Sequence, residues 1–135
     1  MSGETVKGKA LQFTNDNKHA YAYSGLVEVE STEIICLEFN TNSEYLIAEM
    51  QMCYFSTNET DNIKFMITFD NIEIQTTQIN DAFTHTPYTS IKLIIPPFTL
   101  VKVTGKNISG GGSRDIGVSV TAKVGMAARV GNLDE

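Results

Sequence analysis

Residues 63–74 read IKFMITFDNIEI, and this stretch decides the fold class. Every odd position from Ile63 to Phe69 is apolar, while most of the even positions are polar. A period of two residues indicates a β-strand with one buried face and one face in water. Asp70 and Asn71 both tolerate positive φ, and the apolar parity switches from odd to even across them. The stretch therefore predicts two antiparallel strands joined by a tight hairpin turn.

The same patterning recurs along the chain and predicts nine strands. They span residues 9–14, 21–30, 33–39, 45–55, 63–69, 72–78, 90–95, 100–104 and 116–124. Residues 45–55 also suit a helix because they contain Met, Ala, Glu and Gln, but the neighbouring strands favour a strand there as well. No amphipathic segment of helix length lies between the strands, which excludes parallel β-α-β units. The spacing is typical of an all-β sandwich or barrel.

Length and charge restrict the possible partners. A chain of 135 residues fits one domain. We expect the sandwich to occupy residues 1–124, and residues 125–135 to be either a frayed terminus or an arm that docks on a neighbouring subunit. Sixteen acidic and ten basic side chains give a net charge of −6, which argues against nucleic acid as a partner. No apolar run reaches the roughly 18 residues that span a bilayer, and the first ten residues lack the apolar core of a signal peptide, so we expect no membrane partner and synthesis in a cytosol.

Searching for catalytic and metal-binding patterns identifies none. Only His19 and His85 are present, which is too few for a metal-binding double-stranded β-helix and leaves no Ser-His-acid arrangement. Cys36 and Cys53 lie inside apolar strands and are expected to be free thiols. We therefore expect no catalytic residues, no metal site and no cofactor.

Two polar groupings remain open as weaker alternatives. Acidic side chains on predicted strands could meet as a glycosidase pair, although solvated faces of amphipathic strands explain them better. These are Glu28, Glu30, Glu38 and Glu49. Residues 15–17 and 61–62 could supply oxygen ligands to calcium, but they lack the spacing of a dedicated calcium loop.

Residues 91–103 read IKLIIPPFTLVKV and place two prolines inside the most strand-like run of the chain. Proline fixes φ and has no N–H to donate to a strand ladder, so the run should be two strands joined at a corner or an edge bulge. Phe98 and Leu100 lie on the opposite parity to the core-forming positions of this run. The exposed corner formed by Pro96, Pro97, Phe98 and Leu100 is the candidate interface.

The second half of the chain resembles small jelly-roll structural proteins of tailed bacteriophages, namely capsid decoration and minor capsid proteins. The resemblance rests on KFMITFDNIEI, on IKLIIPPFTLVKVTGKN, on a Gly/Ser-rich loop and on the last strand, DIGVSVTAKVGM. The matching residues are Ile95, Pro96, Pro97, Thr99, Val101, Val103, Asn107 and Arg114. Asp70-Asn71 stands where such sequences often read Asn-Gly, and the first half of the chain matches only in its alternating strands.

The resemblance implies a single antiparallel β-sandwich of jelly-roll type, with about eight strands and little or no helix. It also implies a structural role without enzymatic activity: a homotrimeric decoration or cement protein on the capsid exterior, with the major capsid protein as its partner. The alternative is a carbohydrate- or receptor-binding sandwich of the fibre or baseplate type. Five tyrosines could supply stacking platforms for it, although the chain lacks tryptophan.

Overall fold

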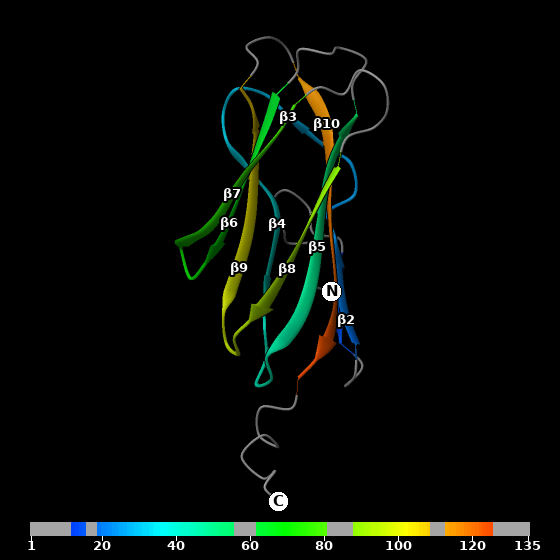
Figure 1. Ribbon diagram of the computed structural model, residues 1–135, viewed down its shortest axis with the longest axis vertical. Coiled ribbons are helices and arrows are strands. Elements are labelled where there is room, and N and C mark those ends of the chain that lie inside the picture. The colour runs from blue at the N-terminus through cyan, green and yellow to red at the C-terminus, as the bar shows by residue number, and fades with distance from the viewer. Residues whose placement is uncertain (1–11, 16–18, 56–61, 81–87, 109–112, 126–135) are drawn as a thin grey trace, which may run out of the picture.

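The computed structural model describes residues 12–15, 19–55, 62–80, 88–108 and 113–125 (Figure 1). These residues form ten β-strands and no helix. The strands are β1 (Gln12–Asn15), β2 (His19–Tyr23), β3 (Val27–Val29), β4 (Ile34–Asn40), β5 (Leu46–Phe55), β6 (Asn62–Phe69), β7 (Ile72–Asn80), β8 (Tyr88–Ile95), β9 (Leu100–Asn107) and β10 (Arg114–Val124). In the described part of the chain, no helix is present that could cross a membrane.

The strands form two antiparallel sheets that lie face to face. Sheet A has the order β1-β2-β10-β5-β8, with β3 also paired to β10, and sheet B has the order β4-β9-β6-β7. The pairs are nested: β2 and β3 pair with β10, β4 with β9, β5 with β8, and β6 with β7. A long hairpin rolled into two sheets in this way is a jelly roll. The predicted all-β jelly-roll sandwich is confirmed.

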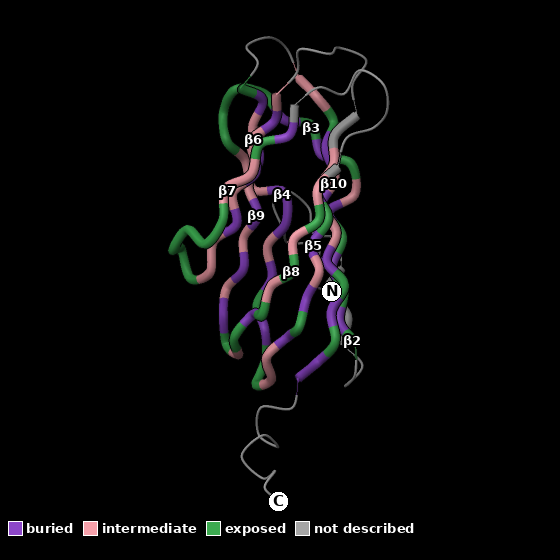
Figure 2. Tube along the Cα trace, in the orientation of Figure 1, coloured by how far each residue is buried: buried purple, intermediate pink, exposed green. Residues whose placement is uncertain are grey.

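The core lies between the sheets and is formed by alternate residues of nearly every strand. Figure 2 shows the resulting alternation of buried and exposed positions along the strands. The largest fully buried side chains are Phe65, Leu37, Leu46, Met50, Met52, Ile63, Ile67, Ile95, Ile116, Val29 and Val101. Each such side chain stabilises the fold by roughly 1.5–3 kcal/mol. The even positions of β5 from Leu46 to Met52 and the odd positions of β6 point inward, as their patterns predict.

The predicted hairpin between β6 and β7 is present, but its second strand differs from expectation. Asp70 and Asn71 have φ values of 52° and 69°, and Phe69 pairs with Ile72 across the turn. The register then shifts, because Ile67 pairs with Gln75 and Thr68 with Glu73. Ile74 is the extra residue of this bulge. The expected core residues Ile72 and Ile74 are both exposed at the hairpin end, which projects from the sandwich in Figure 1.

The predicted strand over residues 21–30 is also interrupted. Ser24 to Leu26 separate β2 from β3, while both strands continue to pair with β10. Ser24 supplies the hydrogen bonds to β10 at the interruption. Its backbone N–H donates to the Val118 carbonyl at 2.9 Å, and its Oγ accepts the Val118 N–H at 2.9 Å. Gly25 takes φ of 71°, which glycine adopts without steric cost. The interruption is therefore a bulge that bends the strand at a glycine.

The proline-containing run forms the corner that its sequence predicts. β8 ends at Ile95 in sheet A, and β9 begins at Leu100 in sheet B, so residues 96–99 carry the chain from one sheet to the other. Ile95, Val101 and Val103 are fully buried. Ile91 and Leu93 are partly buried and pack against the same core.

Candidate functional site

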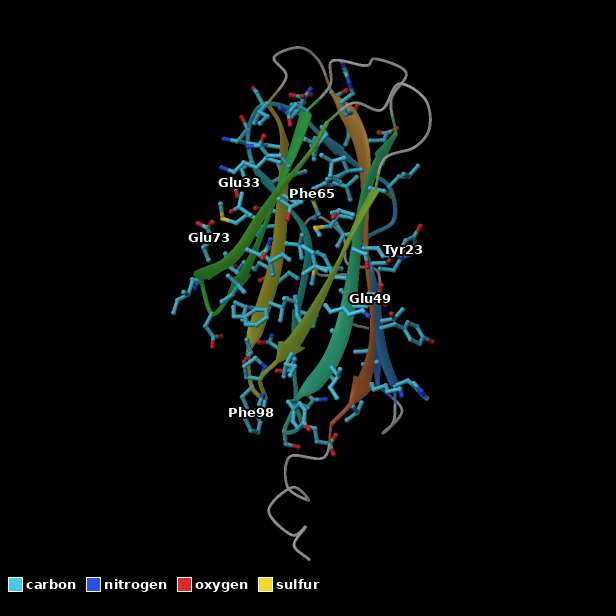
Figure 3. The ribbon with its side chains drawn as sticks, in the orientation of Figure 1. Tyr23, Glu33, Glu49, Phe65, Glu73 and Phe98 are labelled. Atoms are coloured by element: carbon cyan, nitrogen blue, oxygen red, sulfur yellow. The ribbon has the colours of Figure 1, made fainter. Side chains whose placement is uncertain are left out.

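Residues 96–99, called here the Phe98 corner, present an aromatic ring to solvent. Phe98 has 75% of its surface exposed and a positive φ of 53°. Bulky L-residues rarely adopt this φ, because the Cβ atom approaches the following carbonyl. The chain therefore holds a large apolar side chain outside the core in a strained conformation, at the lower tip of the molecule in Figure 3.

Hydrogen bonds from the loop between β4 and β5 fix this corner. Thr41 Oγ1 donates to the Pro96 carbonyl at 2.7 Å and accepts the Thr99 N–H at 2.8 Å. The backbone N–H of Thr41 donates to the Thr99 carbonyl at 2.9 Å, and that of Phe98 donates to the Asn42 carbonyl at 2.8 Å. Thr41 and Thr99 are both buried. These four bonds hold the backbone under the Phe98 ring in place.

The other residues of the candidate interface lie close by but differ in exposure. Pro96 is exposed, whereas Pro97 and Leu100 are partly buried. The Leu100 N–H donates to Asp70 Oδ1 at 2.8 Å, and its carbonyl accepts the Asp70 N–H at 2.8 Å. Leu100 thus connects the β6–β7 turn to β9 by hydrogen bonds. Among these residues, Phe98 offers the main apolar contact surface.

The outer face of sheet A carries a second group of exposed apolar side chains. Tyr21 is 50% exposed, Tyr23 52%, Ile47 50% and Ile94 65%. The strand register places Ile47 directly opposite Ile94. The tyrosines lie on β2, beyond the central strand β10. Neither isoleucine was predicted from the sequence as a surface residue of interest. Each is an apolar residue at a strand position whose neighbours on the same face are polar, and this departure from alternation could have identified them.

The two isoleucines line a depression, called here the sheet A groove, with a volume of about 560 Å³. It lies near the end of the sheet where β5 begins and where β8 and β10 end. Its lining residues that point outward from the sheet are His19, Ile47, Glu49, Lys92, Ile94, Thr121 and Lys123. Glu49 pairs across the strands with Lys92 and accepts a hydrogen bond from Ser90 Oγ at 2.6 Å. The groove therefore combines two exposed isoleucines with two lysines and one carboxylate.

The outer face of sheet B has a different character. Its register aligns Glu38, Lys102, Thr68 and Glu73 in one row across the four strands. Thr76 donates a hydrogen bond to Glu73, and Thr104 donates one to Glu33. Figure 3 shows Glu33 and Glu73 on this side of the sandwich, and Tyr23 and Glu49 on the other. The exposed isoleucines of sheet B, Ile72 and Ile74, lie at the end of the β6–β7 hairpin, whereas those of sheet A lie next to each other on paired strands.

The remaining candidates for chemistry are not assembled into a site. Glu38 and Glu49 lie on different sheets and do not form a carboxylate pair. Within the described ranges, no group of three or more His, Cys, Asp or Glu side chains could hold a metal ion. His85, residues 16–17 and Asp61 lie outside the described residues.

The two cysteines are free, as predicted. Burial, reinforced by the charge of Glu33, raises the pKa of the Cys36 thiol to about 12. Burial also raises the pKa of Cys53, against the opposing effect of a backbone hydrogen bond from Gly117. Both thiols are therefore poor nucleophiles at neutral pH, because the thiolate is the reactive form.

Comparison with known proteins supports the fold. No protein-family model matches the chain, and no curated protein matches it. Among solved structures, the VP2 subviral particle of infectious bursal disease virus matches with a TM-score of 0.55 and 12% identity over 87% of this chain. The chain spans only 34% of that capsid protein's length.

Two further structural matches have lower TM-scores. A family 35 carbohydrate-binding module from Clostridium thermocellum matches with a TM-score of 0.43 and 14% identity, over 85% of this chain and 82% of the module. Dimeric latent PorU from Porphyromonas gingivalis matches with a TM-score of 0.42 and 8% identity, over 89% of this chain and 14% of PorU. At these identities the likeness concerns the β-sandwich fold alone.

Proposed function

We propose that this protein is a virion structural protein: a capsid decoration or cement protein of a tailed bacteriophage that acts without enzymatic activity. The observation that carries the proposal is the exposed Phe98 ring, which the Thr41 hydrogen bonds hold in a strained backbone conformation on a jelly roll. Strain of this kind persists only where the surrounding structure enforces it, and it is concentrated at functional positions. An enforced, exposed aromatic ring suits a contact surface better than a catalytic site.

Two further features support this proposal. The structural match to a viral capsid protein shows that this fold is used in capsids. The net charge of −6 suits a component on the capsid exterior, where it does not contact packaged nucleic acid. The proposed partners are other copies of the chain, in a homotrimer, and a major capsid protein.

Native mass spectrometry at tens of micromolar protein tests the assembly part of the proposal. We expect one defined oligomer, with a trimer as the main species. Sedimentation with capsids built from the major capsid protein of the same virus tests the decoration part, and we expect saturable binding. A chain that stays monomeric and does not sediment with those capsids would contradict the proposal.

The sheet A groove favours one alternative, a carbohydrate-binding role. Tyr21 and Tyr23 are exposed on the same face as the groove, and a tyrosine ring can stack on a sugar. Glu49 and Lys92 would supply hydrogen bonds. A glycan array followed by titration calorimetry tests this role. Binding that Tyr21→Ala weakens would favour the alternative, and an array without hits would exclude it.

A further inference from the structure

We infer that the Phe98 corner of one copy inserts into the sheet A groove of a second copy, so that the chain assembles head to tail. This inference rests on the proposed function, because it describes how the proposed oligomer is built. It assigns a partner to the two apolar surfaces described above. Each surface alone would leave apolar area in water.

The shapes of the two surfaces are complementary. The Phe98 corner is a tight turn that presents one ring with 75% of its surface exposed. The sheet A groove has a volume of about 560 Å³, and the Ile47–Ile94 pair lies among its lining residues. A groove of this volume is several times larger than one aromatic ring, so it can accept the Phe98 ring together with neighbouring parts of the corner.

The charges are complementary as well. Glu44 lies two residues beyond Asn42, which holds the Phe98 N–H, and the Asp70 carboxylate bonds to the Leu100 amide. The corner therefore has the Asp70 carboxylate beside it and Glu44 in the adjoining loop, against one lysine, Lys102, which donates to Asn71 Oδ1 at 3.0 Å. The groove presents Lys92 and Lys123 against Glu49 alone, so it is a positive region on a chain of net charge −6. Opposite potentials steer the two surfaces together and set their orientation.

In the proposed trimer the contact is head to tail, because a reciprocal exchange of corner and groove between two copies would close a two-fold dimer instead. The groove is formed by β2, β10, β5 and β8, whereas the corner connects β8 to β9. Each copy therefore gives a corner to one neighbour and offers a groove to another. Such a contact closes into a ring when the rotation between copies allows it, which is the geometry that a trimer requires.

A mixing experiment tests this inference with two variants. Phe98→Ala removes the inserted ring but keeps the groove, and Ile94→Asp places a charge in the groove but keeps the ring. Native mass spectrometry should show each variant alone as a monomer, with its self-affinity weakened about tenfold or more. A one-to-one mixture should form a heterodimer that grows no further, because it contains one intact corner and one intact groove.

The controls separate a lost contact from a lost fold. Leu26→Asp changes an equally exposed residue, 65% exposed, outside both surfaces and should assemble like the wild type. Cooperative unfolding shows that a variant is folded. If Ile94→Asp does not unfold cooperatively, Lys123→Glu replaces it as the groove variant. A mixture that stays monomeric, or single variants that assemble normally, would overturn the inference. If the inference fails but the wild type still forms oligomers that bind capsids, the proposed function stands. A wild type that is monomeric and does not bind capsids contradicts both the inference and the proposed function.

Discussion

At the scale of single residues, Phe98 combines two features that each cost the isolated chain free energy. Its φ of 53° is strained for an L-residue, and its ring is exposed. Neither feature helps the core, since the core side chains around the corner are Ile95, Val101 and Val103. The residue therefore contributes little to the stability of the monomer and is available for contact with a partner.

Replacing Phe98 with glycine should stabilise the monomer relative to replacing it with alanine. Both variants lose the ring, but only glycine relieves the positive φ. We expect the free energy of unfolding to be about 1 kcal/mol higher for Phe98→Gly than for Phe98→Ala. Urea unfolding measures this difference, at protein concentrations low enough that the chain does not assemble. Equal stabilities would show that the backbone at residue 98 carries no strain.

Cys36 should make stability depend on pH in the alkaline range. Its pKa rises from 9.0 to about 12 on folding, so the folded state holds the thiol proton more tightly than the unfolded state. The corresponding stability is fully present below pH 9 and is lost as the pH rises towards 12. Between pH 8 and pH 10, the free energy of unfolding should fall by about 1 kcal/mol from this group.

Comparing the wild type with Cys36→Ala isolates this contribution from other groups that titrate in the same range. The variant is less stable at pH 8, because it leaves space in the core where Cys36 is fully buried. Its stability should nevertheless fall less steeply with pH than that of the wild type. Parallel pH profiles for the two proteins would show that Cys36 does not cause the dependence.

At the scale of elements, one threonine joins two connections that are far apart in the sequence. Thr41 follows β4, and its Oγ1 bonds to Pro96, 55 residues later. The same oxygen accepts the N–H of the buried Thr99. Without the hydroxyl, a buried donor and a carbonyl would both lose their partner, and leaving a buried polar group unpaired costs about 1–3 kcal/mol.

Thr41→Val should therefore destabilise the protein by about 2 kcal/mol, although valine preserves the shape of the side chain. Thr41→Ser keeps the hydroxyl and should cost less than about 1 kcal/mol. Chemical denaturation of the two variants measures the difference. The valine variant should also assemble poorly, because the Phe98 backbone is then held less firmly. A valine variant as stable as the serine variant would contradict the role of this hydroxyl.

The elements themselves could largely be predicted from the sequence. The alternation in residues 63–69, the Asp70-Asn71 turn and the proline corner are local signals, and the structure confirms all three. The bulges near Gly25 and Ile74 could not be predicted, because a bulge is defined by the register of the partner strand. The sheet A groove was missed for a similar reason: Ile47 and Ile94 become neighbours only when β5 pairs with β8.

At the scale of the whole molecule, the jelly roll leaves open edges as well as open faces. β7 ends sheet B and pairs only with β6 among the described strands. An unpaired edge is a possible site for adding a strand from another chain. The bulge beside Ile74 and the projecting hairpin interrupt this edge near one end. Assembly through the corner and the groove would leave the edge unused.

Hydrogen exchange can distinguish these two modes of assembly. In the monomer, the slowest amides should lie in β10, β5, β9 and β6, which have a partner strand on each side. On assembly, we expect the amides of β7 that do not pair with β6 to keep exchanging rapidly, because a contact between side chains adds no backbone hydrogen bonds at the edge. New slow exchange along β7 would mean that copies join by strand addition, since only a paired strand protects an entire edge.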